Sequence, residues 1–190
     1  LRTYRSLPLF LLTDFFPPGY RSGGPARSCY NLAIGLSDTV PVRVITRDRD
    51  LGEETPYSDV ASDTWVDLTG AATVYYCSPE EQGLRAMYRK LRQGGGDVIY
   101  LNSMFSVPFT IYPLLLHWLG RIGGRMVLAP RGMLKPSALQ FKPAKKKLFL
   151  VLFRLLGWHK GLVFHATSQE EAQDIRRVFA GAQVQVCDIV

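Results

Sequence analysis

The sequence predicts an α/β protein built on a Rossmann-like open parallel sheet with helices on both faces. Short apolar runs of strand length alternate with longer segments of helical character along the chain. Glycine and proline turns separate many of these segments. Such alternation is typical of parallel strands joined by right-handed helical crossovers. A chain of 190 residues is long enough for one such domain, and no repeat or second domain is indicated, so residues 1–190 are expected to form one domain.

Each element is predicted from its apolar pattern and its flanking turns. Strands are expected at residues 7–13, 42–46, 73–77, 98–101, 126–129, 162–165 and 184–187. Helices are expected from Pro25 onward and at residues 79–92, 108–119, 143–156 and 168–179. Residues 51–70 are polar and expected to be irregular. Ser168 and Glu171 match the S-x-x-E capping box, in which two side chains satisfy two unpaired N–H groups at the start of a helix.

Composition and cysteine usage narrow the class of protein. Apolar residues make up 47% of the chain and charged residues 21%, which is ordinary for a folded globular protein and excludes a disordered one. The three cysteines are widely spaced and fit neither a metal-binding motif nor a disulfide framework, which favours a reducing cytoplasm. The apolar run at residues 7–12 is too short to span a membrane and lacks a signal-peptide cleavage site.

The positive charge is concentrated in one half of the chain. The net charge is +7, and no acidic residue occurs between Asp97 and Glu170. The same stretch carries ten basic residues, namely Arg121, Arg125, Arg131, Lys135, Lys142, Lys145, Lys146, Lys147, Arg154 and Lys160. One half of the fold is therefore expected to bind an anionic partner, which could be phospholipid headgroups, a phosphorylated substrate or nucleic acid.

The loop at residues 19–25 is a candidate phosphate-binding site. It follows the first predicted strand and leads into a helix, so it lies at the sheet edge where open parallel sheets bind ligands. Gly23 and Gly24 have no Cβ to block a diphosphate, and the helix N-terminus provides free N–H groups. The alternative is that the glycines only permit a tight turn. The sequence matches neither the G-x-G-x-x-G fingerprint nor a P-loop.

Other polar residues follow predicted strands at the same edge. The side chains of Asn102 and Ser103 could bind sugar hydroxyls, or form a turn or a helix cap. Arg131 could hold a phosphate or carboxylate through its planar guanidinium, or it could be a surface residue. Lys135 follows four residues later and could bind the same anion. His165 ends another strand, where a satisfied core histidine is the favoured interpretation.

Asp48 and Asp50 have the D-x-D spacing that can hold a divalent cation. They lie between arginines in a polar segment, so a solvated turn is favoured, and no metal site is expected.

The segment at residues 143–160 combines a basic start with an apolar run. It is too short to cross a bilayer and is apolar nearly all round, which favours a buried helix with a solvated basic cap. The alternative is that Lys145, Lys146 and Lys147 face an anionic membrane surface.

Three segments, at residues 17–33, 127–147 and 165–179, resemble the N-terminal domain of retaining GT-B glycosyltransferases of family four. They contain the P-P-G-Y-x-x-G-G-P loop, the V-L-A-P-R-G-M-L block and the H-A-T-S-x-E-E-A motif. This family builds bacterial surface polysaccharides and lipopolysaccharide. The resemblance implies two Rossmann-like domains facing each other across a cleft. The N-terminal domain binds the acceptor, and the C-terminal domain, which binds the nucleotide-sugar and carries the paired glutamates, is expected to be absent from this chain.

The resemblance also implies a reaction and partners. Gly23 and Gly24 would approach the donor phosphates, and Asn102 and Arg131 would face the cleft. Many family members have a histidine where this chain has Pro130-Arg131. The expected reaction transfers a sugar from a nucleotide-sugar to a glycan or lipid-linked acceptor with retention, without metal or cofactor. This half alone is expected to be nearly inactive. The protein is expected in the cytoplasm, where it could also bind peripherally to the inner membrane.

Two other classes of protein remain as alternatives. A stand-alone nucleic-acid-binding domain fits the basic charge, but no base-stacking pattern or recognition motif occurs, so nucleic acid is not expected. A nicotinamide-dependent oxidoreductase domain fits the fold, but its glycine fingerprint is missing.

Overall fold

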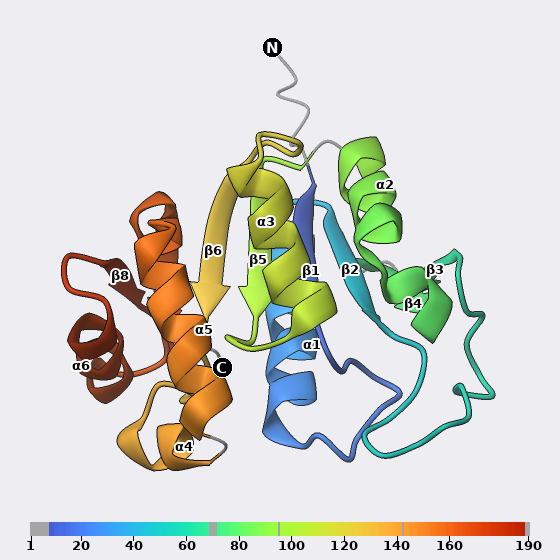
Figure 1. The fold of residues 1–190 in the computed structure, drawn as a ribbon. Coiled ribbons are helices and arrows are strands. Elements are labelled where there is room, and N and C mark those ends of the chain that lie inside the picture. Colours follow the sequence, from blue (N-terminus) through green and yellow to red (C-terminus); the bar gives the residue numbers. More distant parts are fainter. Residues whose placement is uncertain (1–7, 69–71, 95, 142, 189–190) are drawn as a thin grey trace.

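The computed structural model describes residues 8–68, 72–94, 96–141 and 143–188. They form one eight-stranded sheet with the order β3-β4-β2-β1-β5-β6-β7-β8 (Figure 1). Neighbouring strands are parallel, except that β3 runs antiparallel to β4. The strands are β1 (Leu9–Thr13), β2 (Val42–Arg47), β3 (Trp65–Leu68), β4 (Ala72–Cys77), β5 (Val98–Asn102), β6 (Arg125–Ala129), β7 (Leu162–Ala166) and β8 (Gln183–Val186). The predicted Rossmann-like sheet is confirmed.

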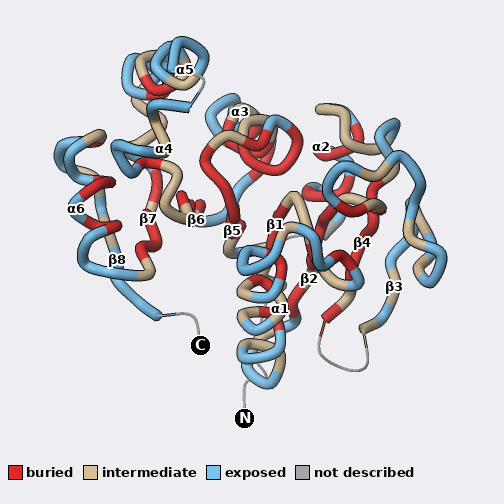
Figure 2. The backbone as a smooth tube through the Cα atoms, turned by 90° about the horizontal axis from the view of Figure 1, so that it is seen from below, coloured by how far each residue is buried: buried red, intermediate tan, exposed pale blue. Residues whose placement is uncertain are grey.

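Helices cover both faces of the sheet, but unequally. They are α1 (Gly24–Ser37), α2 (Leu84–Gly94), α3 (Tyr112–Trp118), α4 (Pro136–Gln140), α5 (Pro143–Leu155) and α6 (Gln169–Val178). In Figure 2, α1 lies on one face of the sheet, and α2, α3 and α5 lie on the other. Two separate cores result: Cys29 and Ala33 of α1 pack in one, whereas residues of α2, α3, α5 and α6 pack in the other.

The order of the strands creates a switch point between β1 and β5. From β1 the chain passes through α1 to β2 on one side, and it later returns through α2 to β5 on the other side of β1. The connections on the two sides therefore leave β1 and β5 in opposite directions, which opens a crevice at the carboxyl ends of these two strands. The central strands themselves are buried because both faces are covered, as at Phe10, Leu11 and Leu12 of β1.

Residues 51–70 were expected to be irregular, and this prediction is wrong in part because they contain β3. This four-residue edge strand, Trp-Val-Asp-Leu, is too short to show a clear alternation. Tertiary contacts hold it instead. The ring of Trp65 packs edge-on against that of Tyr75 on β4, with centroids 5.3 Å apart, and the Arg43 guanidinium lies 5.5 Å from the centre of the Trp65 ring. Cross-strand pairs of this kind stabilise short edge strands.

Two predicted helices are interrupted. Residues 79–92 form a 3₁₀ turn (Pro79–Gln82) and then α2, because Gly83 has extended backbone angles. Residues 108–119 begin with a π-turn (Val107–Ile111) before α3, where Pro113 has no N–H to donate to the preceding turn. The short helix α4 was not predicted.

The prediction that the helix at residues 143–156 is largely buried is wrong. Only Leu150 and Phe153 of α5 are buried. Leu148, Leu152 and Leu155 are 62%, 47% and 77% exposed. The helix is apolar on both sides, but the domain covers only one of them.

We expect Gly96→Ala to destabilise the fold by about 2 kcal/mol, because overpacking a tight backbone contact forces a shift. A Cβ at Gly96 would lie 2.6 Å from the Phe10 ring and 2.8 Å from the Pro8 carbonyl oxygen. Thermal unfolding should show a Tm lower by roughly 4–8 °C. Gly83→Ala is the control, since its Cβ would meet nothing within 4 Å. Equal Tm values for the two variants would contradict this packing.

Candidate functional site

Two adjoining cavities open at the carboxyl edge of the sheet. The larger, of about 540 Å³, is lined by Gly24, Pro25, Ser28, Arg131, Gly132, Lys135, Thr167, Ser168, Glu171 and Asp188. The smaller, of about 250 Å³, is lined by Thr13, Asp14, Phe15, Ser22, Pro25, Leu51, Asn102, Ser103, Arg131 and Met133. Arg131 and Pro25 belong to both, so the two cavities share a wall. The smaller one lies at the carboxyl ends of β1 and β5, where the switch point predicts a crevice.

The N-terminus of α1 borders both cavities. Gly23 is the N-cap residue, with a φ of 65° that a residue with a Cβ adopts only under strain. Its N–H donates to the Tyr20 carbonyl (3.0 Å), which closes the turn before the helix. No side chain caps α1, and its first turn contains no acidic residue. The partial positive charge of this helix end is therefore not offset by a carboxylate of the helix's own first turn.

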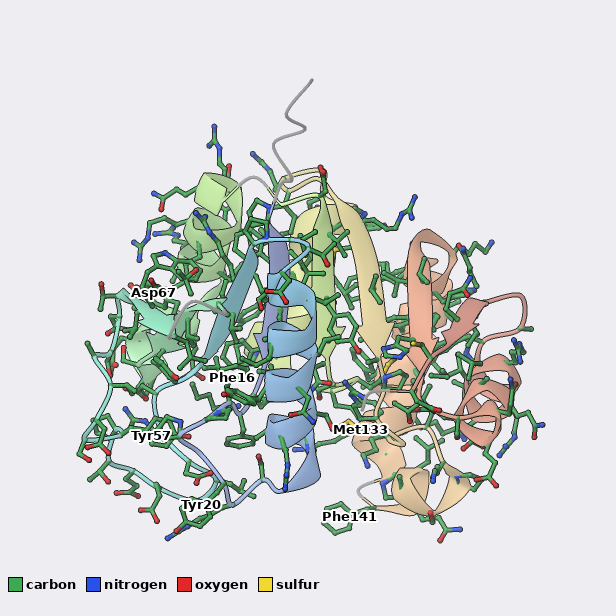
Figure 3. All side chains as sticks on the ribbon, turned by 180° about the vertical axis from the view of Figure 1, so that it is seen from behind. Phe16, Tyr20, Tyr57, Asp67, Met133 and Phe141 are labelled. Carbon is green, nitrogen blue, oxygen red and sulfur yellow. The ribbon has the colours of Figure 1, made fainter. Side chains whose placement is uncertain are left out.

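Asp50 holds the loop that leads into α1. Its Oδ2 accepts hydrogen bonds from the backbone N–H groups of Tyr20 (2.9 Å) and Arg21 (3.1 Å), and its Oδ1 accepts from Leu51 (2.7 Å). Burial by itself would raise the pKa of Asp50, but these hydrogen bonds outweigh burial and keep the pKa below its ordinary value. Figure 3 shows Tyr20 on this loop, below α1 in that view.

The prediction that Asp48 and Asp50 form a solvated turn is wrong, because both residues are buried. Asp48 accepts hydrogen bonds from Arg49 Nε (2.8 Å) and Ser62 Oγ (3.0 Å). Protein donors therefore engage both carboxylates of this pair. Among the described residues, no three histidine, cysteine or acidic side chains gather in a way that could hold a metal ion.

A chain of hydrogen bonds links the ends of four strands behind the cavities. Asn102 on β5 donates to Thr13 Oγ1 on β1 (3.2 Å) and accepts from Arg131 Nε. Arg131, directly after β6 and Pro130, donates through Nη2 to the Tyr100 hydroxyl (3.3 Å). The Tyr100 hydroxyl in turn lies 2.6 Å from Nδ1 of His165 on β7.

The far end of this chain fixes the direction of the bonds. His165 Nε2 lies 2.7 Å from the Cys187 carbonyl oxygen, which can only accept, so Nε2 carries the proton. In the neutral imidazole Nδ1 then accepts from the Tyr100 hydroxyl, and the Tyr100 oxygen accepts from Arg131. Burial raises the pKa of Tyr100, and Arg131 opposes that rise only in part, so the hydroxyl stays protonated at neutral pH.

The backbone after β6 is unusual at two consecutive residues. Arg131 and Gly132 have φ values of 55° and 71°. A left-handed conformation costs a residue with a side chain about 1–2 kcal/mol. The bonds from Arg131 to Asn102 and Tyr100 hold it there. In the described part of the chain, Nη1 of Arg131 makes no hydrogen bond. This guanidinium therefore has an edge available to a ligand.

Glu171 ties two loops of the larger cavity together. Its Oε1 accepts from the Gly132 N–H (2.6 Å), and its Oε2 accepts from the N–H and the hydroxyl of Thr167 (2.8 Å each). Burial alone would raise the pKa of Glu171, but these hydrogen bonds and Arg131 outweigh it, so the pKa lies below its ordinary value. The predicted capping box is half confirmed: Ser168 Oγ accepts from the Glu171 N–H (3.1 Å), but the carboxylate binds Thr167 and Gly132 instead of capping Ser168.

The smaller cavity is lined by one member of an ion pair, Asp14, and by apolar residues. Asp14 accepts from Arg47 Nη2 (2.8 Å) and Ser106 Oγ (2.9 Å). The Ser103 hydroxyl is directed to the Met133 sulfur (3.6 Å). Phe15 and Leu51 add apolar surface. Figure 3 places Met133 beside the lower end of α1, where the helix begins.

The structure brings most of the predicted site residues together. Gly24, Arg131 and Lys135 line the larger cavity, and Asn102, Ser103 and Arg131 line the smaller one. Gly23 lies next to the site without lining it. His165, a candidate for the cleft whose favoured interpretation is a satisfied core histidine, lines neither cavity. It is buried, and both of its ring nitrogens have hydrogen-bond partners, as the core interpretation predicts. Lys145, Lys146 and Lys147 lie on α5, outside both cavities.

Sequence reasoning missed Tyr100, Thr13 and the role of Glu171. Tyr100 and Asn102 are two residues apart on β5, so their side chains point to the same face. That two-residue spacing could have identified Tyr100 as a residue that lies next to Asn102 at the site.

Comparison with known proteins gives a match among solved structures. No family model matches the chain, and no curated protein matches its sequence. Among solved structures, sucrose-phosphate synthase from Thermosynechococcus elongatus superposes on 95% of this chain with a TM-score of 0.64 and 15% sequence identity. The match covers 47% of that enzyme's chain, so this chain spans about half of its length. At this identity, the similarity shows that the chain has the fold of one part of that enzyme.

We expect Glu171→Gln to lower the stability by about 1–3 kcal/mol at neutral pH, because buried N–H donors lose a charged acceptor. Since the pKa of Glu171 is lowered by folding, its contribution is full above the ordinary pKa of about 4.3 and disappears as the pH falls through the lower folded value. The Tm difference from the parent protein should therefore shrink between pH 7 and pH 3. Glu170→Gln, at an exposed neighbour, is the control. A Tm difference that is the same at both pH values would contradict this role.

Proposed function

We propose that this chain is the acceptor-side half of a glycosyltransferase that moves a sugar from a nucleotide-sugar donor to an acceptor. The convergence of the uncapped α1 N-terminus, Arg131 and Lys135 on the larger cavity carries the proposal. The fold supports it, because the structural neighbour, sucrose-phosphate synthase, is a GT-B glycosyltransferase.

The larger cavity suits the diphosphate of the donor. Helix N-termini bind phosphate through free N–H groups, and a guanidinium binds it through paired N–H donors. Two acidic residues, Glu171 and Asp188, also line this cavity. The two Glu171 oxygens are occupied by Thr167 and Gly132, which leaves the Asp188 carboxylate against Arg131, Lys135 and the helix end. Lys135 is exposed and has no ion pair in the described part of the chain. The balance of available charge is positive, as stabilisation of a departing diphosphate requires.

The smaller cavity suits a sugar hydroxyl of the acceptor. Asn102, Ser103 and Asp14 provide polar groups, and Phe15 and Leu51 provide apolar surface for the face of a sugar ring. Because Arg131 belongs to both cavities, the acceptor would lie next to the donor phosphates. Placing two substrates side by side in a fixed orientation is itself a large part of catalysis.

The finer assignment rests on the three family-four segments. It specifies hexosyl transfer with retention, an acceptor that is a glycan or a lipid-linked sugar, and a place in bacterial polysaccharide or lipopolysaccharide synthesis. The paired glutamates and the main nucleotide-binding groups would belong to a second domain outside residues 1–190, so this half alone would be nearly inactive. Protein donors engage both Asp48 and Asp50, which supports chemistry without a metal.

We expect sodium pyrophosphate, titrated into the ¹⁵N-labelled chain, to shift the amide signals of Gly24 and Gly132 with a Kd of about 1 mM, near −4 kcal/mol. Gly24→Val should weaken this binding about tenfold and leave the Tm within a few degrees, because a Cβ at Gly24 would meet nothing within 4 Å. Gly35→Val, at an equally open site in the same helix, is the matched control and should bind as the parent does. Equal binding by both variants, or shifts confined to other amides, would contradict the phosphate site.

A parallel titration with single-stranded DNA at two salt concentrations separates the proposal from a nucleic-acid-binding function. We expect weak binding to DNA that does not displace pyrophosphate from the Gly24 amide. Tight DNA binding that falls steeply with salt would favour the nucleic-acid alternative, because such a dependence reports the release of counterions from phosphates.

A further inference from the structure

The outer face of α5 carries an apolar stripe. Leu148, Leu152 and Leu155 are spaced by four and three residues, so their side chains lie on one side of the helix. The opposite side carries the buried Leu150 and Phe153, which pack into the core. Figure 2 shows α5 at the outside of the sheet face, with exposed residues along its outer side.

Basic residues flank this stripe. Helical geometry of 100° per residue places Lys145 on one side of the leucines and Lys147 and Arg154 on the other. All three are exposed. Lys146 is different: its Nζ donates to the Ala138 carbonyl (2.6 Å) and lies 5.3 Å from the centre of the Phe105 ring, so it holds α4 against α5. The prediction that all three lysines face outward is therefore wrong for Lys146.

We propose that the α5 surface, formed by Leu148, Leu152 and Leu155 with Lys145, Lys147 and Arg154, docks on an anionic lipid bilayer. An exposed apolar stripe between cations is typical of helices that lie in the plane of a membrane interface. The leucines enter the region between headgroups and acyl chains, and the long basic side chains extend to the headgroup phosphates. No helix of the described chain is both long and apolar enough to cross a bilayer.

Charge complementarity favours lipid over a second copy of this chain. Two α5 surfaces packed against each other would bring Lys145, Lys147 and Arg154 of one copy against the same residues of the other. The sequence between Asp97 and Glu170 provides no carboxylate to offset this repulsion. An anionic bilayer provides the opposite charge together with an apolar interior. The inference does not depend on the proposed sugar transfer.

The apolar surface continues beyond the end of α5. Trp118, at the end of α3, is 53% exposed, and it shares an apolar groove with Gly157 and Trp158, which follow α5. Leu119 and Leu156 are 51% and 41% exposed at the same two helix ends. A tryptophan at the border of an apolar stripe is typical of the level of lipid headgroups.

The test is flotation of the 190-residue chain with vesicles of phosphatidylglycerol mixed with phosphatidylcholine, compared with vesicles of phosphatidylcholine alone. We expect binding to the anionic vesicles only. Leu148→Gln, Leu152→Gln and Leu155→Gln together should lower the partition coefficient at least about tenfold. Lys145→Gln with Lys147→Gln should lower it about 25-fold, since each cation near the surface is worth about fivefold, and should reduce the salt dependence.

The matched controls are Ile34→Gln and Arg27→Gln, which change an exposed apolar and an exposed basic residue of α1 on the opposite face of the sheet. They should bind as the parent does. The changed leucines are exposed, and far-UV circular dichroism should confirm that the triple variant remains folded. Equal partition of the leucine variant and its parent, or equal binding to neutral vesicles, would overturn the proposal. So would self-association that the leucine changes abolish, because a second copy would then cover the stripe.

Discussion

The hydrogen-bond chain from Thr13 to the Cys187 carbonyl is the interaction on which the geometry of the site depends. It passes through Asn102, Arg131, Tyr100 and His165, and it ties together strand ends that belong to separate crossovers. At the switch point the connections leave β1 and β5 in opposite directions, so the segments that follow these two strands diverge. Side chains have to provide the cohesion there. The strained φ of Arg131 follows from the same requirement, because in that conformation the guanidinium reaches both Asn102 and Tyr100.

Two buried carboxylates, those of Asp50 and Glu171, each hold a loop in place beside this chain of hydrogen bonds. Asp50 accepts from backbone N–H groups of the loop before α1, and Glu171 accepts from Gly132 and Thr167. In both residues, hydrogen bonds keep the pKa below its ordinary value in spite of burial. A carboxylate saturated in this way rigidifies a loop, and few of its lone pairs remain for a ligand. The cations of the larger cavity therefore keep their attraction for an anion, although Glu171 lies in its wall.

The parts of the structure that the sequence predicts are those fixed by neighbours along the chain. Apolar runs predict the central strands, because strands covered on both faces need apolar side chains at nearly every position. Parallel topology then brings Gly24, Asn102 and Arg131 to one edge. The failures depend on distant partners. Asp50 is buried because its partners are Tyr20 and Arg21, about thirty residues away. The Glu171 carboxylate leaves its local capping role for Gly132, 39 residues away. Both sides of α5 carry apolar residues, so the sequence alone does not show which side packs against the rest of the domain.

The acid-free half of the sequence does not form one uniform basic surface. The structure divides its cations by role: Arg131 belongs to the site, Lys146 braces α4 and Phe105, and Lys145, Lys147 and Arg154 flank the leucines of α5. The start of α5 lies at the same edge of the sheet at which the cavities open (Figure 1). A bilayer in contact with α5 would therefore lie beside the mouth of the site. In that arrangement, an acceptor held in the membrane by a lipid anchor could present its sugar to the cavity without leaving the bilayer. In that arrangement the two apolar sides of α5 would have separate roles: one side stabilises the fold, and the other would set where the fold works.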